Sequence, residues 1–177
     1  MSLAFETREG LFSPAHADHG TLAMLSYADF QPGMRVLDLG CGWGLVGIAA
    51  AKMCGAENVW MADIDPLAVE SARENAARNG VSGAHFCVSD GFSGIDAAGF
   101  DIILSNPPYQ SDFSVAKGFI EKGFNRLKIG GRMLMVTKRE GWYRNKFTAI
   151  FGGVRVFRRD GYFVFVAERR RSARGAM

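Results

Sequence analysis

The sequence predicts a doubly wound α/β fold, in which helices cover both faces of a mostly parallel sheet that an antiparallel hairpin closes. The first reason is that short apolar runs alternate with segments of helical composition or spacing from residue 35 onward. The second reason is the dipeptide Asp160-Gly161, which separates two runs rich in aromatic and β-branched residues, 154–159 and 162–168. Asp-Gly between two such runs is typical of a two-residue β-hairpin.

The first half of the chain predicts two strand–helix units. RVLDLG (35–40) is an apolar run that ends in glycine, as buried strands do, and LVGIAAAKMC (45–54) has helix-forming composition. NVWMADI (58–64) predicts the second strand. The segment 66–80 predicts a helix because it begins with proline, repeats apolar residues every three or four positions and ends in Asn-Gly.

The second half continues the alternation. HFCVSD (85–90) and DIILSN (101–106) predict the third and fourth strands. VAKGFIEKGFNRL (115–127) has the amphipathic spacing of a helix, which two following glycines should end. RMLMVTK (132–138) predicts the fifth strand, and YRNKFTAIF (143–151) predicts a helix before the hairpin.

Length and composition fit one domain. The chain has 177 residues, of which 48% are hydrophobic and 22% charged. We expect a lid or helix segment (1–33), a core (34–168) and a basic tail (169–177). No apolar run approaches the roughly 20 residues that span a membrane, and the start lacks the features of a secretory signal. The three cysteines form no Cys-x-x-Cys pair, so we expect a cytoplasmic protein without a metal site.

Positive charge gathers at the carboxyl-terminal end. Residues 138–177 hold 11 Lys and Arg against 3 Asp and Glu, whereas residues 1–137 hold 10 against 15. Such an excess of arginine neutralises phosphates, so we expect a nucleic-acid partner that Arg158 and Arg159 contact. For residues 169–174, a solvated tail is the alternative.

The turn after the first predicted strand, DLGCGWG (38–44), is rich in glycine, which lets a ligand approach the backbone closely. Positions 42, 44 and 47 formally match the dinucleotide fingerprint Gly-x-Gly-x-x-Gly. However, an aspartate stands two positions before the first glycine of the turn, and this arrangement suits a ligand with a cationic amine. We expect the cofactor-binding loop to consist of Asp38, Gly40, Cys41, Gly42 and Gly44.

Acidic residues end the next two predicted strands. Asp63 is placed to hold a ribose diol, with Ile64 against an adenine face. Asp90, followed by Gly91, is placed to accept a hydrogen bond from an adenine amino group. Helix capping or a turn is the alternative for each aspartate. Ligands of doubly wound folds bind at the carboxyl ends of strands, so these residues and Asp38 together predict a pocket for S-adenosylmethionine.

The fourth predicted strand ends in Asn-Pro-Pro-Tyr, because proline cannot continue a sheet ladder. The Asn106 side-chain oxygen and the Pro107 carbonyl are two acceptors that can take hydrogen bonds from the protons of an exocyclic amine and free its conjugated lone pair. Tyr109 can stack on the base that carries the amine. These groups suit a planar NH₂ target, and a rigid turn without chemistry is the alternative.

In this order and spacing, DLGCGWG, MADID, VSD and SNPPY resemble the class I S-adenosylmethionine-dependent methyltransferases. More narrowly, they resemble the methyltransferase small domain family, which includes bacterial 16S ribosomal RNA guanine-N2 methyltransferases, here in a single-domain form. The resemblance implies a Rossmann-like methyltransferase sheet, S-adenosylmethionine as the cofactor, and the family's catalytic roles for Asn106, Pro107 and Tyr109.

The segment before the glycine loop, GLFSPAHADHGTLAML (10–25), is also similar to that family. The resemblance implies that Phe12 belongs to a lid beside the cofactor and the substrate. It also implies that Asp18, Gly20 and Thr21 shape the wall near the methionine end of the cofactor. Helix capping is the alternative for Asp18 and Thr21.

We expect an N-methyltransferase that acts on structured RNA, most of all on guanine N2 of small-subunit ribosomal RNA, as a monomer or homodimer without membrane or metal. Tyr109 stands where guanine-modifying members more often have Phe or Ile, and we expect no counterpart of the duplicated N-terminal domain of the longer enzymes. Adenine N6 in RNA, a protein glutamine and a small-molecule amine are therefore alternative targets. A nicotinamide-dependent oxidoreductase and a non-catalytic RNA-binding module are alternatives from other classes.

Overall fold

The computed structural model describes residues 2–7, 17–108 and 112–171, so Phe12 and Tyr109 lie outside the described residues. The helices are α1 (His19–Leu25), α2 (Leu45–Cys54), the short η1 (Ala56–Asn58), α3 (Pro66–Arg78), α4 (Phe113–Arg126) and α5 (Gly141–Phe151). The strands are β1 (Val36–Leu39), β2 (Val59–Asp63), β3 (His85–Val88), β4 (Phe100–Ser105), β5 (Leu127–Thr137), β6 (Arg155–Arg159) and β7 (Tyr162–Glu168).

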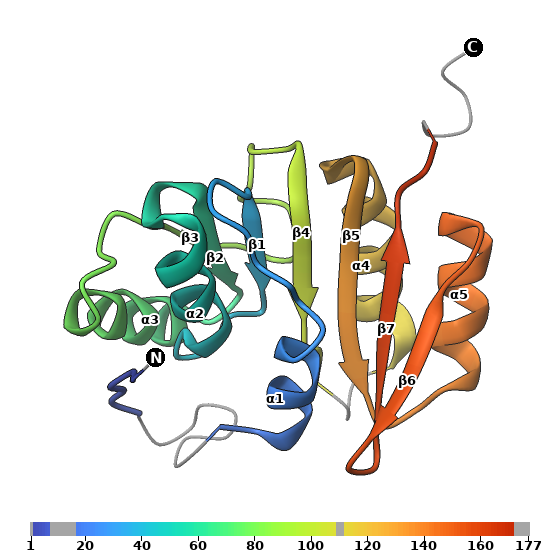
Figure 1. Ribbon diagram of the computed structural model, residues 1–177, viewed down its shortest axis with the longest axis horizontal. Coiled ribbons are helices and arrows are strands. Elements are labelled where there is room, and N and C mark those ends of the chain that lie inside the picture. Colours follow the sequence, from blue (N-terminus) through green and yellow to red (C-terminus); the bar gives the residue numbers. More distant parts are fainter. Residues whose placement is uncertain (1, 8–16, 109–111, 172–177) are drawn as a thin grey trace.

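The strands form one sheet in the order β3-β2-β1-β4-β5-β7-β6 (Figure 1). Strands β1 to β5 pair in parallel, β7 pairs antiparallel with β5, and β6 pairs antiparallel with β7. The predicted mixed sheet with its closing hairpin is therefore confirmed. The strand order reverses between β1 and β4, and ligands of doubly wound folds bind beside this point.

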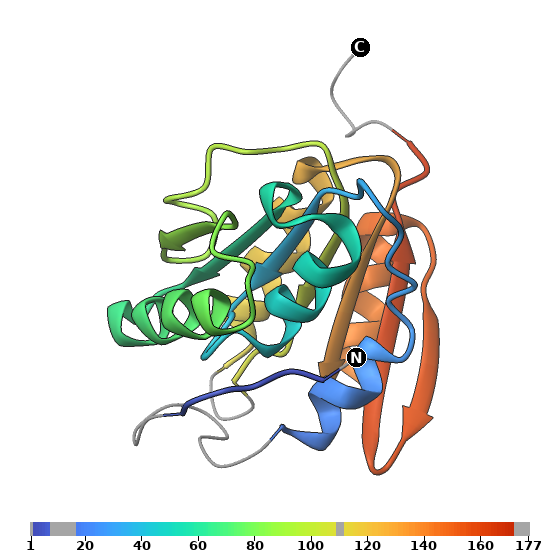
Figure 2. The ribbon, with the colours of Figure 1, turned by 60° about the vertical axis from the view of Figure 1, so that its left-hand side comes forward.

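Helices cover both faces of the sheet (Figures 1 and 2). On one face α1, α2 and α3 contribute to a core that includes Ile48 and Ala72, both buried. On the other face α4 and α5 contribute to a core that includes Ile120 and Phe147. In the described part of the chain, every helix is too short or too polar to cross a membrane.

Local sequence signals account for several boundaries. Helix α3 begins at Pro66, the Asp65 carboxylate accepts a hydrogen bond from the Leu67 N–H at 2.9 Å, and the helix ends before Asn79. At the hairpin, Asp160 and Gly161 have φ angles of 51° and 80°. Positive φ at both positions is the geometry of a type I′ turn, as the Asp-Gly pair predicts.

The start of β5 differs from the expected residue 132. The strand begins at Leu127, so Gly130 and Gly131 lie within it and do not separate it from a helix. A side-chain carbon at Gly131 would lie 2.7 Å from the Phe100 carbonyl oxygen, and the pairing register shifts opposite Phe100. Glycine is required here because two backbone segments approach closely at an irregularity of the strand. In the sequence, this pair of glycines looks the same as a pair that ends a helix.

Two buried asparagines, Asn75 in α3 and Asn79 at its C-cap, hold the N-terminal segment. Asn79 exchanges hydrogen bonds with the backbone N–H and carbonyl of Ala4, and Asn75 does the same with Glu6. Asn75 also donates to the carbonyl of Trp43 at 2.9 Å. The N-terminal segment is thereby tied to α3 and, through Trp43, to the turn that follows β1.

Candidate active site

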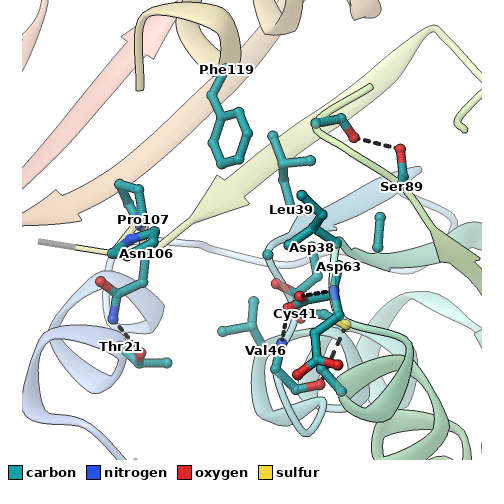
Figure 3. A pocket seen from close by; sticks show the side chains of 18 of the residues that line it. Thr21, Asp38, Leu39, Cys41, Val46, Asp63, Ser89, Asn106, Pro107 and Phe119 are labelled. Atoms are coloured by element: carbon teal, nitrogen blue, oxygen red, sulfur yellow. Dashed lines mark hydrogen bonds between the residues drawn. The ribbon is translucent and has the colours of Figure 1, made fainter. Parts of the chain in front are cut away.

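A cavity of about 330 Å³ opens at the carboxyl ends of β1 to β4, and its size is within the usual range for small-molecule pockets (Figure 3). Ten of the predicted site residues line it: Asp38, Gly40, Cys41, Gly42, Asp63, Ile64, Asp90, Gly91, Asn106 and Pro107. In Figure 3, Asn106 and Pro107 lie on one side of the cavity, and Asp38, Cys41 and Asp63 lie on the other. The structure therefore brings four separate turns together around one space.

Gly44, which the sequence places in the cofactor loop, does not line the cavity. It precedes α2 with a φ angle of +100°, and a side-chain carbon there would lie 3.0 Å from Ile48 and 3.2 Å from the backbone of Ala72. Both the positive φ and the contact with Ala72 require glycine. Gly44 therefore allows α2 to pack closely against α3.

The loop after β1 is held firmly and leaves room above its backbone. The N–H groups of Gly40 and Cys41 both donate to the carbonyl of Ala62 in β2, at 2.8 and 2.9 Å. Gly40 and Gly42 have φ angles of 78° and 52°, and a side-chain carbon at either position would meet no atom within 4 Å. A ligand can therefore approach this backbone closely. Burial raises the pKa of the Cys41 thiol, which suits a small packing residue and not a nucleophile.

Asp38 is a buried carboxylate at the floor of the cavity. Its Oδ2 accepts a hydrogen bond from the Gly47 N–H at 2.8 Å, near the start of α2. The pKa of Asp38 is raised to about 7, and the main cause is burial. The hydrogen bond from Gly47 lowers the pKa in part, and the negative charge of Asp63 adds a smaller increase. A positively charged group in the cavity would favour the ionised form of this carboxylate.

Asp63, at the end of β2, supports two turns. Its Oδ2 accepts from the Gly42 N–H at 2.9 Å, and its Oδ1 accepts from the Asp65 N–H at 3.0 Å. A carboxylate has about four acceptor sites, so each oxygen retains capacity for a further hydrogen bond. Asp63 therefore shapes the glycine loop and can also receive hydroxyl donors from a ligand.

The turn after β3 places Asp90 and Gly91 at the mouth of the cavity. Ser89 is buried beneath them; its hydroxyl donates to the Gly91 carbonyl at 2.7 Å and accepts from the Gly94 N–H at 2.8 Å. Asp90 is exposed, and its backbone N–H donates to the Ser93 hydroxyl at 3.2 Å. These contacts fix the turn and leave the Asp90 carboxylate facing solvent and the cavity.

Two apolar residues of α4 complete the cavity and were not among the predicted site residues. Phe119 and Val115 line it, and the Phe119 ring lies 3.6 Å from the position of a side-chain carbon at Gly91. Figure 3 shows Phe119 above the cavity. The two residues are four apart on the helix that follows β4, and this spacing was the signal that they share a face at the carboxyl edge of the sheet.

Asn106 follows β4, and its amide orientation is fixed by its partners. Its Nδ2 donates to Oδ2 of Asp18 at 2.8 Å and to Oγ1 of Thr21 at 2.9 Å. A carboxylate can only accept, so the group that faces Asp18 must be the NH₂. Both amide hydrogens are thus directed to the segment at the start of α1, and the side-chain oxygen can act only as an acceptor.

Asp18 has the capping role that was its alternative, whereas Thr21 supplies the capped N–H. Asp18 caps α1 through a hydrogen bond from the Thr21 N–H to Oδ2 at 3.0 Å. Both residues also line the cavity and bind Asn106. The cap therefore also forms one wall of the cavity.

Arg158 and Arg159 lie outside the cavity, at the same end of the sheet. They end β6, which runs in the direction of β5, and both are exposed. Arg158 lies 3.4 Å from the Glu140 carboxylate, and Arg159 donates to the Ser26 hydroxyl at 3.0 Å. Lys138 and Arg139 directly follow β5, so basic side chains gather beside the carboxyl ends of the strands.

Comparison with known proteins identifies close similarities. Residues 2–167 match the family described as the methyltransferase small domain. The chain is 30% identical over 171 residues to Bacillus subtilis YbxB, covering 93% of this chain and 85% of that protein. It is 32% identical over 179 residues to ribosomal RNA small subunit methyltransferase C of Serratia proteamaculans, covering 98% of this chain and 51% of the relative.

Among solved structures, the T. thermophilus 16S rRNA N2 G1207 methyltransferase RsmC, in complex with AdoMet and guanosine, has a TM-score of 0.85 and 27% identity. The match covers 93% of this chain and 46% of that enzyme, so the chain spans about half the length of the ribosomal RNA methyltransferases that it resembles. The alternative of a nicotinamide-dependent oxidoreductase finds no support in these similarities. The chain belongs to the methyltransferase small domain family of S-adenosylmethionine-dependent methyltransferases.

Proposed function

We propose that this protein methylates an exocyclic amine of a base in structured RNA, with guanine N2 of small-subunit ribosomal RNA as the preferred target. The observation that carries the proposal is the orientation of Asn106, whose NH₂ is bound by Asp18 and Thr21 at the edge of the cavity. This arrangement commits the side-chain oxygen to accepting a hydrogen bond, which is the role that a target amine requires.

The cavity residues fit S-adenosylmethionine. The open backbone of Gly40 and Gly42 leaves room for the ligand, and the buried Asp38 carboxylate complements its cationic amine. Asp63 and Asp90 would hold the ribose hydroxyls and the adenine amino group. Ile64, Val115 and Phe119 line the cavity, and Ile64 is exposed to solvent. These apolar side chains would pack on the adenine ring, which would remove their surface from water.

S-adenosylmethionine supplies a methyl group on a sulfonium, whose thioether is a good leaving group. The remaining task of the protein is to align a poorly nucleophilic amine with that methyl group. Asn106 Oδ1 and the Pro107 carbonyl would accept hydrogen bonds from the two amine N–H groups and favour a nitrogen whose lone pair is free to attack. Catalysis would then come mainly from proximity and from oriented dipoles. Tyr109, outside the described residues, would stack on the base.

The names of the relatives support RNA as the substrate, and guanine N2 as the position, because the RsmC structure is that of a 16S rRNA N2 methyltransferase bound to guanosine. The basic residues Lys138, Arg139, Arg158 and Arg159 lie at the same end of the sheet as the cavity and suit a phosphate backbone. Tyr109 favours adenine N6 as the second candidate, because the guanine-modifying members that the sequence resembles more often carry Phe or Ile there.

Replacement of Asn106 by alanine removes the proposed acceptor. For Asn106→Ala we expect a loss of kcat of about 100-fold or more, comparable to removal of one transition-state hydrogen bond, while the Kd for S-adenosylmethionine changes by less than about threefold. Labelled methyl transfer to RNA and calorimetric titration of the cofactor measure the two quantities. The control is Asn125→Ala on the exposed face of α4, which should retain wild-type kcat. An Asn106→Ala protein with full activity would contradict the mechanism.

The buried Asp38 predicts a pH dependence of cofactor binding. Its pKa is about 7, so the carboxylate is mostly neutral below that pH and mostly ionised above it. Because a cationic amine binds the ionised form, affinity for S-adenosylmethionine should rise by up to about tenfold per pH unit as pH increases from about 5.5 to 7. Asp38→Asn should bind more weakly and lose this slope in calorimetric titrations, whereas the exposed Asp29→Asn should keep it. The same slope in Asp38→Asn would rule out this role.

The hairpin arginines should contribute to RNA affinity and not to cofactor affinity. In Arg158→Ala/Arg159→Ala we expect the KM for RNA to rise about tenfold. We also expect the slope of log affinity against log salt to decrease by roughly 0.7 for each lost phosphate contact. Arg155→Ala, at the opposite end of the same strand, is the matched control. An unchanged salt dependence in the double variant would remove these residues from the RNA contact.

A further inference from the structure

We propose that Tyr162, acting through Asp18, positions the Asn106 amide for methyl transfer, and this proposal rests on the function proposed above. Tyr162 is the first residue of β7, and its only predicted role was in the closing hairpin. Its hydroxyl donates to Oδ1 of Asp18 at 3.1 Å. It is a positioning residue, because its contact with the site passes through Asp18.

The three residues form a continuous hydrogen-bonded path. Oδ1 of Asp18 accepts from Tyr162, and Oδ2 of the same carboxylate accepts from Nδ2 of Asn106 at 2.8 Å. The second hydrogen of the Asn106 amide is directed to Oγ1 of Thr21 at 2.9 Å. The hairpin, the start of α1 and the turn after β4 are thereby joined at one point.

The chemistry of these groups fixes the direction of each hydrogen bond. The Asp18 carboxylate has no hydrogen to donate, so both Tyr162 and Asn106 must donate to it. Rotation of the Asn106 amide by half a turn would place its oxygen against the Asp18 carboxylate, so the hydrogen bond between them would be replaced by a repulsive contact between two acceptors. The Tyr162 hydroxyl restrains the other oxygen of Asp18 and so limits the rotation of the carboxylate that holds the amide.

The position of the Tyr162 ring is itself closely defined. A side-chain carbon at Gly20 would lie 2.7 Å from two carbons of the ring, so glycine at this position allows the ring to approach α1. Lys138, which directly follows β5, also contacts the ring. Its ammonium lies 5.1 Å from the centroid of the Tyr162 ring, within the range of a cation–π contact. The ring is therefore held in place by contacts that do not involve the hydroxyl.

A purely structural role for Tyr162 would attach the hairpin to α1 and would predict a different result. Because the ring contacts persist in phenylalanine, Tyr162→Phe removes only the hydroxyl. The Asp18 cap of α1 is also retained, since the Thr21 N–H is unchanged. Substitution of Asp18 itself would remove the cap and the amide contact together, so it does not separate the two roles.

The test compares kcat and KM in four variants of the full chain. In Tyr162→Phe and Thr21→Val we expect kcat to fall by about tenfold, within the range seen when partners that orient active-site groups are removed, with KM values for S-adenosylmethionine and RNA within about twofold. Thr21→Ser restores the hydroxyl that receives Asn106 and should recover the kcat that Thr21→Val loses. Tyr27→Phe removes a phenolic hydroxyl near the end of α1 and should also retain kcat. Wild-type kcat in Tyr162→Phe, or an equal loss in Tyr27→Phe, would overturn the proposal.

A second readout does not require the RNA substrate. In ¹⁵N-labelled protein, the side-chain NH₂ signals of Asn106 are identified by their loss in Asn106→Ala. We expect these signals to shift in Tyr162→Phe and Thr21→Val and to stay in place in Tyr27→Phe. If the wild type methylates no RNA, the proposed function fails, and the NMR signals still test the positioning path. Unchanged Asn106 signals in Tyr162→Phe would then overturn the positioning role.

Discussion

The parallel alignment of β1 to β4 is the constraint on which the site depends, because it brings the carboxyl ends of four strands to one edge of the sheet. Each strand delivers one polar side chain there, Asp38, Asp63, Asp90 and Asn106 in turn. The order of strands reverses between β1 and β4, and the cavity opens at this crossing. The hydrogen bonds of Asn106 then attach α1 to the same edge and complete the wall.

The carboxylates proposed to bind the cofactor, Asp38 and Asp63, also stabilise the structure around the cavity. Asp38 fixes the start of α2 through Gly47, and Asp63 fixes the glycine loop through Gly42. A buried acid is costly to ionise, which is why burial raises the pKa of Asp38. The same groups that would meet the cofactor thus define the loop around it, and a ligand with a positive charge relieves the cost of burial.

Much of this arrangement follows from local sequence signals. Apolar runs and glycine or proline boundaries predicted the alternating elements and the hairpin, and strand ends predicted ten residues of the cavity lining. The glycines of β5 misled the prediction because close backbone contact and a helix end use the same residue. The partners of Asn106 lie 88 and 85 residues away, and Tyr162 lies 144 residues from Asp18. Such contacts depend on how α1 and β7 pack in the folded protein, and the local spacing of apolar residues carries no information about that packing.

The most direct test of the central claim is transfer of labelled methyl from S-adenosylmethionine to total ribosomal RNA and to assembled 30S particles, followed by nucleoside analysis. The account predicts label in N2-methylguanosine, lost in Asn106→Ala. Label in N6-methyladenosine would keep the amine mechanism and replace guanine by the second candidate. No label in any nucleoside, with the cofactor bound by the protein, would contradict the assignment of RNA as the substrate.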